Sequence, residues 1–161
     1  MTQSFDPFAL VAEFHEKFDL RYDGPPRFLD DDAFAFRRRF KLEELHEFLT
    51  AHQEGDLEGA LDGLVDLVYV VLGTAYLQGF DFNEAFRRVH AANMRKERAP
   101  EALASRRGSA LDVVKPAGWT PPWLKDLVNT ETCEAEGCRH GRRGPAVGGC
   151  VRINCPGRAR R

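Results

Sequence analysis

The chain has 161 residues, enough for one domain of ordinary size and too few for two. Its composition is 43% hydrophobic and 30% charged, which excludes a wholly disordered chain. We expect no membrane span, because the longest apolar stretch, Leu64 to Leu77, contains Asp66 and falls short of the roughly 20 residues required. The N-terminus lacks the basic start and apolar stretch of a secretory signal, so we expect a cytoplasmic protein.

The charge is unevenly distributed along the chain. Although the formal net charge is -2, residues 139–161 contain seven Arg and no acidic residue, which leaves 16 basic and 25 acidic groups in the first 138 residues. An acidic body is a poor match to a nucleic-acid-binding core, so we do not expect nucleic acid as a partner of the core. The basic tail is either a solvated extension or a contact for nucleic-acid phosphates.

The spacing of apolar residues predicts an all-α body of four helices. The first covers about residues 6–20 and begins with an Asp-Pro pair, a common N-cap and first-turn combination. The second covers residues 32–53, the third residues 57–78, and the fourth runs from residue 81 or 83 to about residue 97. The second helix has five core candidates, Phe36, Phe40, Leu45, Phe48 and Leu49.

The helical periodicity stops after Pro100. Residues 100–123 are predicted to form an extended arm, and residues 123–128 a helical turn. No segment alternates as a strand would. We therefore predict an all-α domain over residues 1–128 and a separate Cys- and Arg-rich tail over residues 129–161.

Acidic residues at helical spacing are the main indication of function. Glu43, Glu44 and Glu47 share an arc of the second helix, and Asp62 and Asp66 lie four residues apart on the third. The short link between the helices favours an antiparallel pair in which the two acidic stripes face each other. The alternative is that these side chains form a solvated helix face.

A divalent cation would account for these acids. Asp66 lies in the most apolar part of the chain, where a carboxylate is costly to bury without a cationic partner, and no Lys or Arg occurs between residues 42 and 86. Carboxylate ligands favour Mg²⁺ or Mn²⁺ over Zn²⁺. Such a site would polarise a phosphoryl oxygen and present an activated water.

Five fragments, in this order, resemble one known family. They are Phe14-His15 with Phe18, Glu43-Glu44-x-x-Glu47, Asp62-Gly-Leu-Val-Asp66 with Tyr69, Gly73 and Ala75, Val89-His90-x-x-Asn93-Met94-x-Lys96, and Lys115-Pro-x-Gly-Trp-x-Pro-Pro122. Together they resemble the MazG-like superfamily of all-α nucleotide pyrophosphohydrolases, nearest the branch of phosphoribosyl-ATP pyrophosphohydrolase-like proteins and dimeric dUTPase-like enzymes. The resemblance covers roughly residues 8–124.

The resemblance implies a four-helix bundle that forms a homodimer, or a dimer of dimers, and hydrolyses a nucleoside triphosphate to the monophosphate and pyrophosphate with Mg²⁺ or Mn²⁺. By position, Glu44, Glu47 and Asp66 would be metal ligands. Glu43 would bind a second metal or orient the attacking water, which makes Glu43 and Glu47 the candidate catalytic residues. Asn93 and Lys96, three apart on the fourth helix, would face the nucleotide, with Lys96 on phosphate.

The sequence departs from the family at one position. The second motif of the family is usually Glu-x-x-Asp, and this chain has Gly63 at the Glu position. Asp62 is the nearby carboxylate that would replace it as the fourth metal ligand, on the same stripe as Asp66.

Basic and aromatic residues add candidate substrate contacts. Release of pyrophosphate needs charge neutralised on the leaving group and a water aimed at the α-phosphorus. Four cations precede the Glu cluster by one or two turns, and we expect two of them to be solvated: Arg37, Arg38, Arg39 and Lys41. Arg38 is the candidate phosphate contact, together with Lys115. Trp119 would stack on a base or anchor the dimer.

The tail contains all four cysteines, as Cys133-x4-Cys138 and Cys150-x4-Cys155. Four thiolates would bind one structural Zn²⁺, although the spacing is wider than the usual Cys-x2-Cys. A disordered tail with free thiols and a disulfide-paired tail both stay open.

The leading prediction is an Mg²⁺-dependent nucleotide pyrophosphohydrolase in nucleotide-pool housekeeping. One alternative is hydrolysis of phosphoribosyl-ATP by the same leaving-group chemistry. Another is a catalytically weak helical dimer that serves as a binding module.

Overall fold

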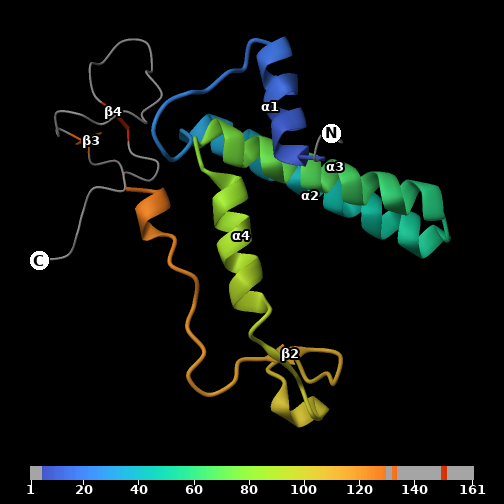
Figure 1. Cartoon of the computed structure of the whole chain (residues 1–161). Coiled ribbons are helices and arrows are strands. Elements are labelled where there is room, and N and C mark those ends of the chain that lie inside the picture. The colour runs from blue at the N-terminus through green and yellow to red at the C-terminus, as the bar shows by residue number, and fades with distance from the viewer. Residues whose placement is uncertain (1–4, 130–131, 134–149, 152–161) are drawn as a thin grey trace, which may run out of the picture. The chain divides into compact units, whose positions relative to one another are not determined.

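The computed structural model describes residues 5–129, 132–133 and 150–151 (Figure 1). Its four main helices are α1 Pro7–Lys17, α2 Asp31–Glu54, α3 Leu57–Leu77 and α4 Phe82–Asn93. Two 3₁₀ turns follow, Ala102–Ala104 and Lys125–Leu127. The all-α prediction is confirmed for the body, and the turn expected within residues 123–128 is present.

Short strands are the feature that the sequence did not predict. β1 Glu97–Arg98 pairs antiparallel with β2 Val113–Val114, and β3 Thr132–Cys133 pairs antiparallel with β4 Cys150–Val151. Each strand has two residues, too few to leave an alternating pattern in the sequence.

The chain divides into two compact units. The first unit comprises Met1–Phe82 with Val128–Arg161 and contains α1, α2 and α3, while the second comprises Asn83–Leu127. The division at residue 128 into a domain and a tail stays a prediction, because most of the tail lies outside the described residues.

Aspartate caps define the starts of the first three helices. Asp6, Asp30 and Asp56 each accept a hydrogen bond from a backbone N–H in the following first turn, at 3.0, 2.8 and 3.0 Å respectively. The Asp6 cap confirms the predicted start of α1. Gly55, with a φ of 74°, ends α2 in the left-handed conformation that glycine adopts without strain.

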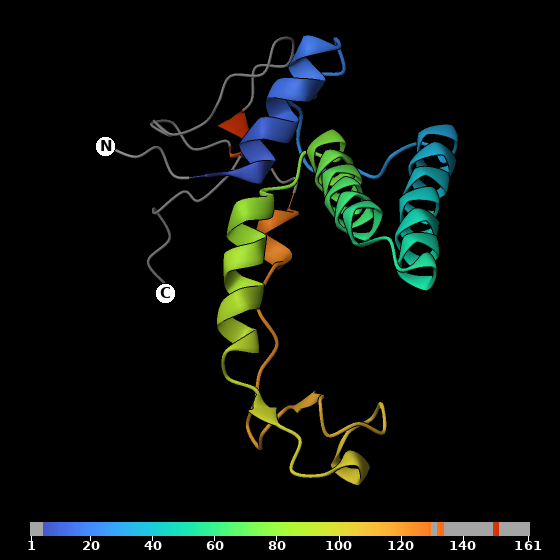
Figure 2. The ribbon, with the colours of Figure 1, turned by 90° about the vertical axis from the view of Figure 1, so that its right-hand side faces the viewer.

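α2 and α3 form an antiparallel hairpin (Figures 1 and 2). Near the connection, Gly63 of α3 lies against the backbone of Phe48. Farther along, the Arg37 guanidinium of α2 donates to the Val70 carbonyl at 2.5 Å and to Thr74 Oγ1 at 3.2 Å. The part of α2 between residues 37 and 48 therefore lies opposite the part of α3 between residues 63 and 74.

α1 contacts α3 close to the Arg37 contact. The buried His15 ring of α1 lies 4.9 Å from the Tyr76 ring, centroid to centroid. A Cβ placed on Gly73 would come within 2.8 Å of both His15 Cε1 and Arg37 Nη2. Glycine at position 73 therefore allows side chains from α1 and α2 to meet on α3.

The core of the hairpin differs from the predicted one. The buried residues of α2 are Arg37, Glu44 and Ala51, which lie seven residues apart. Of the five apolar candidates, Phe36, Leu45 and Leu49 are exposed, and Phe40 and Phe48 are half-buried. The prediction was wrong because each helix of a pair buries only the stripe that contacts its partner, and a second apolar stripe stays exposed.

α3 is also long and apolar enough to cross a membrane by length and composition alone. It contacts both α1 and α2, and a core helix of a soluble protein passes the same test. The helix is therefore weak support for a membrane span.

The second unit begins with α4, which ends at Asn93 and not near residue 97 as predicted. Arg95 Nη1 donates to the Ala91 carbonyl at 3.2 Å, and the Trp119 indole N–H donates to the Ala92 carbonyl at 2.9 Å. These side chains satisfy carbonyls that another helical turn would have used. Lys96 consequently lies beyond the helix and not on it.

Candidate functional site

The five predicted acidic residues lie on the α2–α3 hairpin. Glu44 is buried, with 7% of its surface exposed, whereas Glu43, Glu47, Asp62 and Asp66 are exposed. The expectation that Asp66 is the buried carboxylate was therefore wrong, and the buried one is Glu44. The reason is that Glu44 belongs to the stripe of α2 that contacts α3.

Electrostatics connect the other four acids to Glu44. Burial raises the pKa of the Glu44 carboxyl, and the charges of Glu47, Asp66, Glu43 and Asp62 raise that pKa further, in this order of importance. All four carboxylates thus lie within electrostatic reach of one buried carboxyl, so the acidic stripes of α2 and α3 meet there.

No protein cation compensates this charge in the part of the chain that the structure describes. Glu44 has no hydrogen bond or ion pair there, and along the chain the last Lys or Arg before it is Lys41 and the first after it is Arg87. An ionised carboxylate so placed is unfavourable unless a positive charge joins it.

The donor set fits a hard divalent cation by its chemistry. Carboxylate oxygens are the ligands that Mg²⁺ and Mn²⁺ prefer. In the arrangement described, however, no three His, Cys, Asp or Glu side chains are grouped closely enough to hold an ion, again among described residues only. Binding of an ion by these acids would therefore require their side chains to move.

The glutamate missing from the second motif has a steric explanation. A Cβ at Gly63 would lie 2.9 Å from the backbone nitrogen and 3.1 Å from the Cα of Phe48. Position 63 therefore faces the backbone of α2 and has no room for a side chain. Asp62, one residue earlier, is exposed and contributes the smallest of the four charge effects on Glu44.

The basic residues before the Glu cluster divide into two kinds. Arg37 is buried and bonded to α3, and desolvation lowers its pKa, so it is not free to contact phosphate. Arg38 and Arg39 are exposed, and Lys41 is half-buried. The sequence signal for the structural role of Arg37 is its spacing of seven residues from Glu44.

An open hollow of about 310 Å³ lies on α2 and is lined by Phe36, Arg39, Phe40 and Glu43. It combines two aromatic rings, a guanidinium and the candidate catalytic carboxylate Glu43. The sequence prediction placed Phe36 in the core and named Arg39 only as one of four cations near the Glu cluster, so it did not bring the two residues together.

The second unit contains the remaining candidate substrate contacts. The Nζ atoms of Lys96 and Lys115 lie 5.9 and 4.4 Å from the centroid of the Trp119 ring. Asn93 is the exposed last residue of α4. The structure thus brings Lys96, Lys115 and Trp119 together from segments about 20 residues apart.

Of the predicted zinc ligands, Cys138 and Cys155 lie outside the described residues. The backbone of Cys133 in β3 is paired with that of Cys150 in β4. Zinc binding by the tail stays a prediction.

Comparison with known families supplies the decisive observation for the hairpin. The sequence model of phosphoribosyl-ATP pyrophosphohydrolase matches residues 11–93, more than half of the chain. The chain belongs to this family. Comparison with curated proteins finds no match.

Membership in the phosphoribosyl-ATP pyrophosphohydrolase family confirms the resemblance and the all-α fold. It makes the protein a hydrolase of phosphoric anhydride bonds that acts on a nucleotide, in a family whose enzymes generally use divalent metal ions. The matched region contains both acidic stripes and ends at Asn93. Lys96, Lys115 and Trp119 therefore lie beyond the part that defines the phosphoribosyl-ATP pyrophosphohydrolase family.

Proposed function

We propose that the protein is an Mg²⁺- or Mn²⁺-dependent pyrophosphohydrolase that converts a nucleoside triphosphate, or a related nucleotide, to the monophosphate and pyrophosphate. The observation that carries the proposal is the buried Glu44 carboxyl, whose pKa is raised by four other carboxylates and which has no cationic partner among the described residues. A divalent ion would supply the missing charge and would attract the phosphates of a nucleotide.

Glu44, Glu47 and Asp66 would hold the ion, with Asp62 in place of the glutamate that position 63 cannot accommodate. When bound, the ion neutralises charge on the phosphoanhydride. Glu43, exposed beside the hollow on α2, orients a water against the α-phosphorus and accepts its proton. The new bond forms between the water oxygen and the α-phosphorus, and the bond to the β-phosphate oxygen breaks, so pyrophosphate leaves.

The proposed substrate contacts are basic, amide and aromatic side chains. Arg38 is exposed on α2, one helical turn and a half before Glu43, and is proposed as a phosphate contact. Asn93, Lys96, Lys115 and Trp119 are proposed to bind the nucleotide. Lysine and arginine suit this role because phosphate oxygens accept charge-assisted hydrogen bonds.

The proposed assembly is a homodimer. The outer surface of the hairpin exposes apolar side chains on both helices, which are Leu42, Leu45 and Leu49 on α2 and Leu61, Leu64, Val65 and Val68 on α3. A second hairpin would bury these residues and complete a four-helix bundle. Light scattering coupled to size-exclusion chromatography should give twice the mass of the chain.

The test is pyrophosphate release from a panel of nucleotides, with and without Mg²⁺ or Mn²⁺. Glu47→Gln should abolish turnover and leave the helical dimer folded. Glu54→Gln is the matched control, because Glu54 is an exposed glutamate at the end of α2 that does not perturb Glu44. Full activity of Glu47→Gln would remove the metal site from the proposal.

The panel should include phosphoribosyl-ATP, which the matched family favours as a second candidate substrate. If phosphoribosyl-ATP is the one nucleotide of the panel that is hydrolysed, the function is hydrolysis of phosphoribosyl-ATP and not nucleotide-pool housekeeping. Absence of turnover with every nucleotide would favour the alternative of a catalytically weak helical dimer that serves as a binding module. Glycine at position 63, where the family usually has glutamate, supports that alternative.

Two further expectations accompany the proposal. Elemental analysis of the purified chain should find about one Zn²⁺ per chain if Cys133, Cys138, Cys150 and Cys155 bind it. Folded, zinc-free protein would dismiss that site. We also propose a cytoplasmic location, without a membrane partner, and nucleic-acid contact only through the basic tail.

A further inference from the structure

The open hollow on α2 has a lining suited to a flat ligand. The Phe36 and Phe40 rings lie 5.8 Å apart, centroid to centroid, with their planes inclined at 52°. Phe36 is 52% exposed, so much of its ring is available to a ligand. Aromatic rings offer faces on which a nucleic-acid base stacks. The hollow of about 310 Å³ is at the lower end of small-molecule sites, which span about 300–1,000 Å³, and this favours a small group such as one base.

The Phe40 ring is held in place by a buried arginine. The Arg37 guanidinium carbon lies 5.5 Å from the Phe40 centroid. Arg37 is itself bonded to the Val70 carbonyl and to Thr74 Oγ1 of α3. A ring that is fixed in this way loses little conformational freedom when a ligand binds, which favours affinity. Phe40 is therefore a preformed wall of the hollow.

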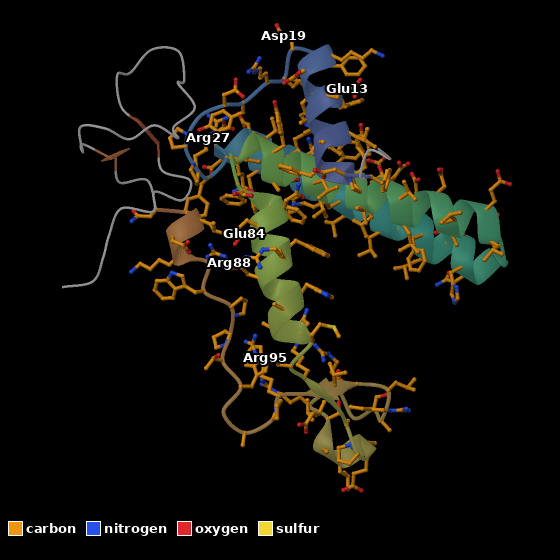
Figure 3. The ribbon with its side chains drawn as sticks, in the orientation of Figure 1. Glu13, Asp19, Arg27, Glu84, Arg88 and Arg95 are labelled. Carbon is orange, nitrogen blue, oxygen red and sulfur yellow. The ribbon has the colours of Figure 1, made fainter. Side chains whose placement is uncertain are left out.

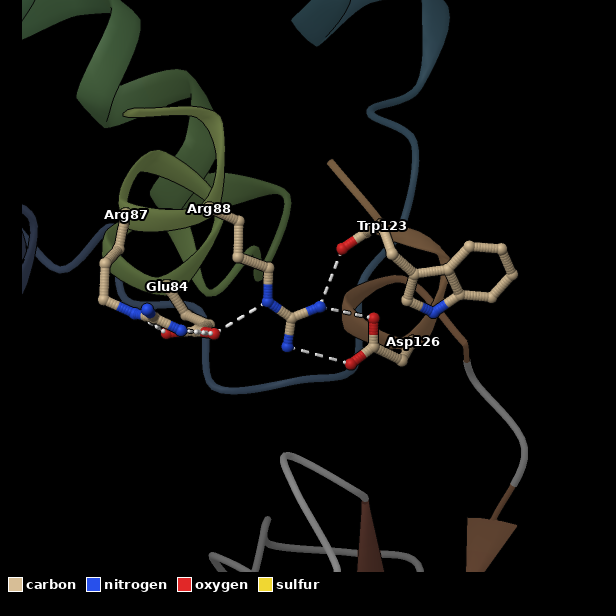
Figure 4. A network of polar contacts seen from close by, with 5 residues as sticks. All are labelled: Glu84, Arg87, Arg88, Trp123 and Asp126. Carbon is tan, nitrogen blue, oxygen red and sulfur yellow. Dashed lines mark hydrogen bonds and ion pairs between the residues drawn. The ribbon is translucent and has the colours of Figure 1, made fainter. Parts of the chain in front are cut away.

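Arg39 gives the hollow a guanidinium without a protein partner, because it forms no hydrogen bond or ion pair with another described residue. Arg88 shows the contrast, since its Nε donates to Glu84 at 2.7 Å. Its Nη atoms donate to both Asp126 carboxylate oxygens at 2.7 and 3.0 Å and to the Trp123 carbonyl at 2.8 Å (Figure 4). Figure 3 labels three arginines with such acceptors: Arg27, Arg88 and Arg95. The N–H donors of Arg39 stay available to a ligand.

A guanidinium distinguishes between bases because it donates hydrogen bonds and accepts none. Uracil, thymine and guanine carry a keto oxygen, which accepts, at the ring position where cytosine and adenine carry an amino group, which donates. In DNA recognition, arginine correspondingly pairs with guanine, whereas asparagine and glutamine pair with adenine. An arginine that faces this ring position therefore favours a keto base over an amino base.

The hollow lies on the same side of α2 as the candidate catalytic carboxylate. At 100° per residue, four residues fall within one arc of about 60°: Phe36, Phe40, Glu43 and Glu47. Each ring precedes one of the carboxylates by seven residues, which is about 10 Å along the helix axis. This separation is comparable to that between a base and the α-phosphate of the same nucleotide. A base in the hollow would thus place its α-phosphate near Glu43 and Glu47.

The proposed homodimer leaves this side of α2 open. The exposed leucines proposed for the dimer contact lie roughly opposite the arc on the helix: Leu42, Leu45 and Leu49. A second hairpin bound to these leucines would leave the hollow accessible. The hollow is therefore available to a ligand in the dimer as well.

We propose that the hollow binds the base of the nucleotide, with Phe36 and Phe40 against the base and Arg39 donating to its keto oxygen. The substrate class is then a triphosphate of a keto base, which is uracil, thymine or guanine, in preference to cytosine or adenine. The inference rests on the proposed function, because it assigns the base to a site whose phosphate chemistry is itself proposed.

The probes are the α,β-imido analogues of UTP and CTP, with Mg²⁺, titrated into the full chain by calorimetry. These analogues resist cleavage at the α-phosphorus and differ from each other only in the pairing edge of the base. The parent should bind the uracil analogue about tenfold more tightly, the scale of one specific contact between a side chain and a base. Equal affinity, or tighter binding of the cytosine analogue, would overturn the keto preference.

Substitution of Arg39 tests the selectivity. Glutamine both donates and accepts, so Arg39→Gln should bring the ratio of the two Kd values to about one. Arg39→Lys keeps a charged donor and should retain the preference for uracil. A uniform loss of affinity in Arg39→Gln, for both analogues and for inorganic pyrophosphate, would assign Arg39 to the phosphates and overturn its role in base selection.

Substitution of Phe36 tests the stacking and has a matched control on the same helix. Phe36→Leu should raise the Kd of both analogues about tenfold, the scale of one contact between a base and an aromatic ring. Phe34→Leu is the control, because Phe34 is 55% exposed but lies two residues away, on the other side of α2. It should leave both Kd values unchanged. Both rings are exposed, so helix content by circular dichroism should stay that of the parent. Equal behaviour of the two variants would overturn the stacking role.

The outcomes separate this inference from the proposed function. If no nucleotide is hydrolysed but Arg39→Gln still removes the preference for the uracil analogue, the base site stands and the proposed function fails. If nucleotides are hydrolysed with equal kcat/KM for keto and amino bases in parent and Arg39→Gln, the base site fails and the proposed function stands. Turnover of phosphoribosyl-ATP alone, whose base derives from adenine, would also overturn the keto preference.

Discussion

Gly63→Ala tests the closest approach of α2 and α3. The added Cβ would lie 2.9 Å from the backbone nitrogen and 3.1 Å from the Cα of Phe48, distances that real Cβ atoms rarely or never show. Because the obstructing atoms belong to the backbone of a helix, they cannot turn aside as a side chain would. The two helices must separate locally, and the substitution should destabilise the fold.

The magnitude follows from two opposing effects. Overpacking of a close contact costs about 1–3 kcal/mol. Alanine in place of glycine within a helix recovers about 1 kcal/mol. Since backbone relieves the clash less easily than side chains do, we expect a net loss of about 1–2 kcal/mol in the free energy of unfolding. For a chain of this length, this loss corresponds to a decrease in Tm of roughly 2–8 °C.

Thermal unfolding of the metal-free protein, followed by calorimetry or circular dichroism, measures this loss. Asp62→Ala is the control, because it changes the exposed neighbour and should alter stability by no more than about 0.5 kcal/mol. Gly63→Glu, which restores the residue usual in the family, should destabilise further and should not raise activity. A Tm of Gly63→Ala equal to or above that of the parent would refute the close approach, as would a more active and equally stable Gly63→Glu.

Three further predictions concern charged groups. Glu44→Gln should raise the Tm of the metal-free protein, measured in EDTA at neutral pH, because it removes a carboxyl whose pKa is raised by burial. The same substitution should lower the rate of pyrophosphate release. A lower Tm would contradict the presence of an uncompensated negative charge at Glu44. Asp62→Asn should strongly impair turnover if Asp62 replaces the missing glutamate, and near-native turnover would contradict that substitution. Arg87 and Arg88 lower the pKa of Glu84 to about 2, so the stabilisation from these pairs is complete above the ordinary pKa of 4.5 and is lost as the pH falls through about 2. The emission of Trp119 and Trp123 should therefore change between pH 4 and pH 2, and a change complete by pH 4 would argue against this pairing.

Local sequence signals were sufficient to predict the positions of the helices and to single out the acidic residues of the hairpin. Apolar periodicity, with an aspartate cap at the start of α1, placed α1, α2 and α3 within a few residues of their observed ends, because both signals depend on neighbours within one or two turns. The spacing of Glu43, Glu44, Glu47, Asp62 and Asp66 likewise sufficed to place two acidic stripes on adjacent helices.

The tertiary structure decided which of those groups is buried and what lies against it. Periodicity shows that a helix has an apolar face, but α2 also has a stripe of Arg37, Glu44 and Ala51, and only the contact with α3 selects that stripe for burial. The end of α4 depends in the same way on Trp119, whose indole reaches Ala92 across 27 residues of sequence. A residue pattern reports the tendency of each segment, whereas burial and pairing depend on which distant atoms meet, and those distances exist only in the folded chain.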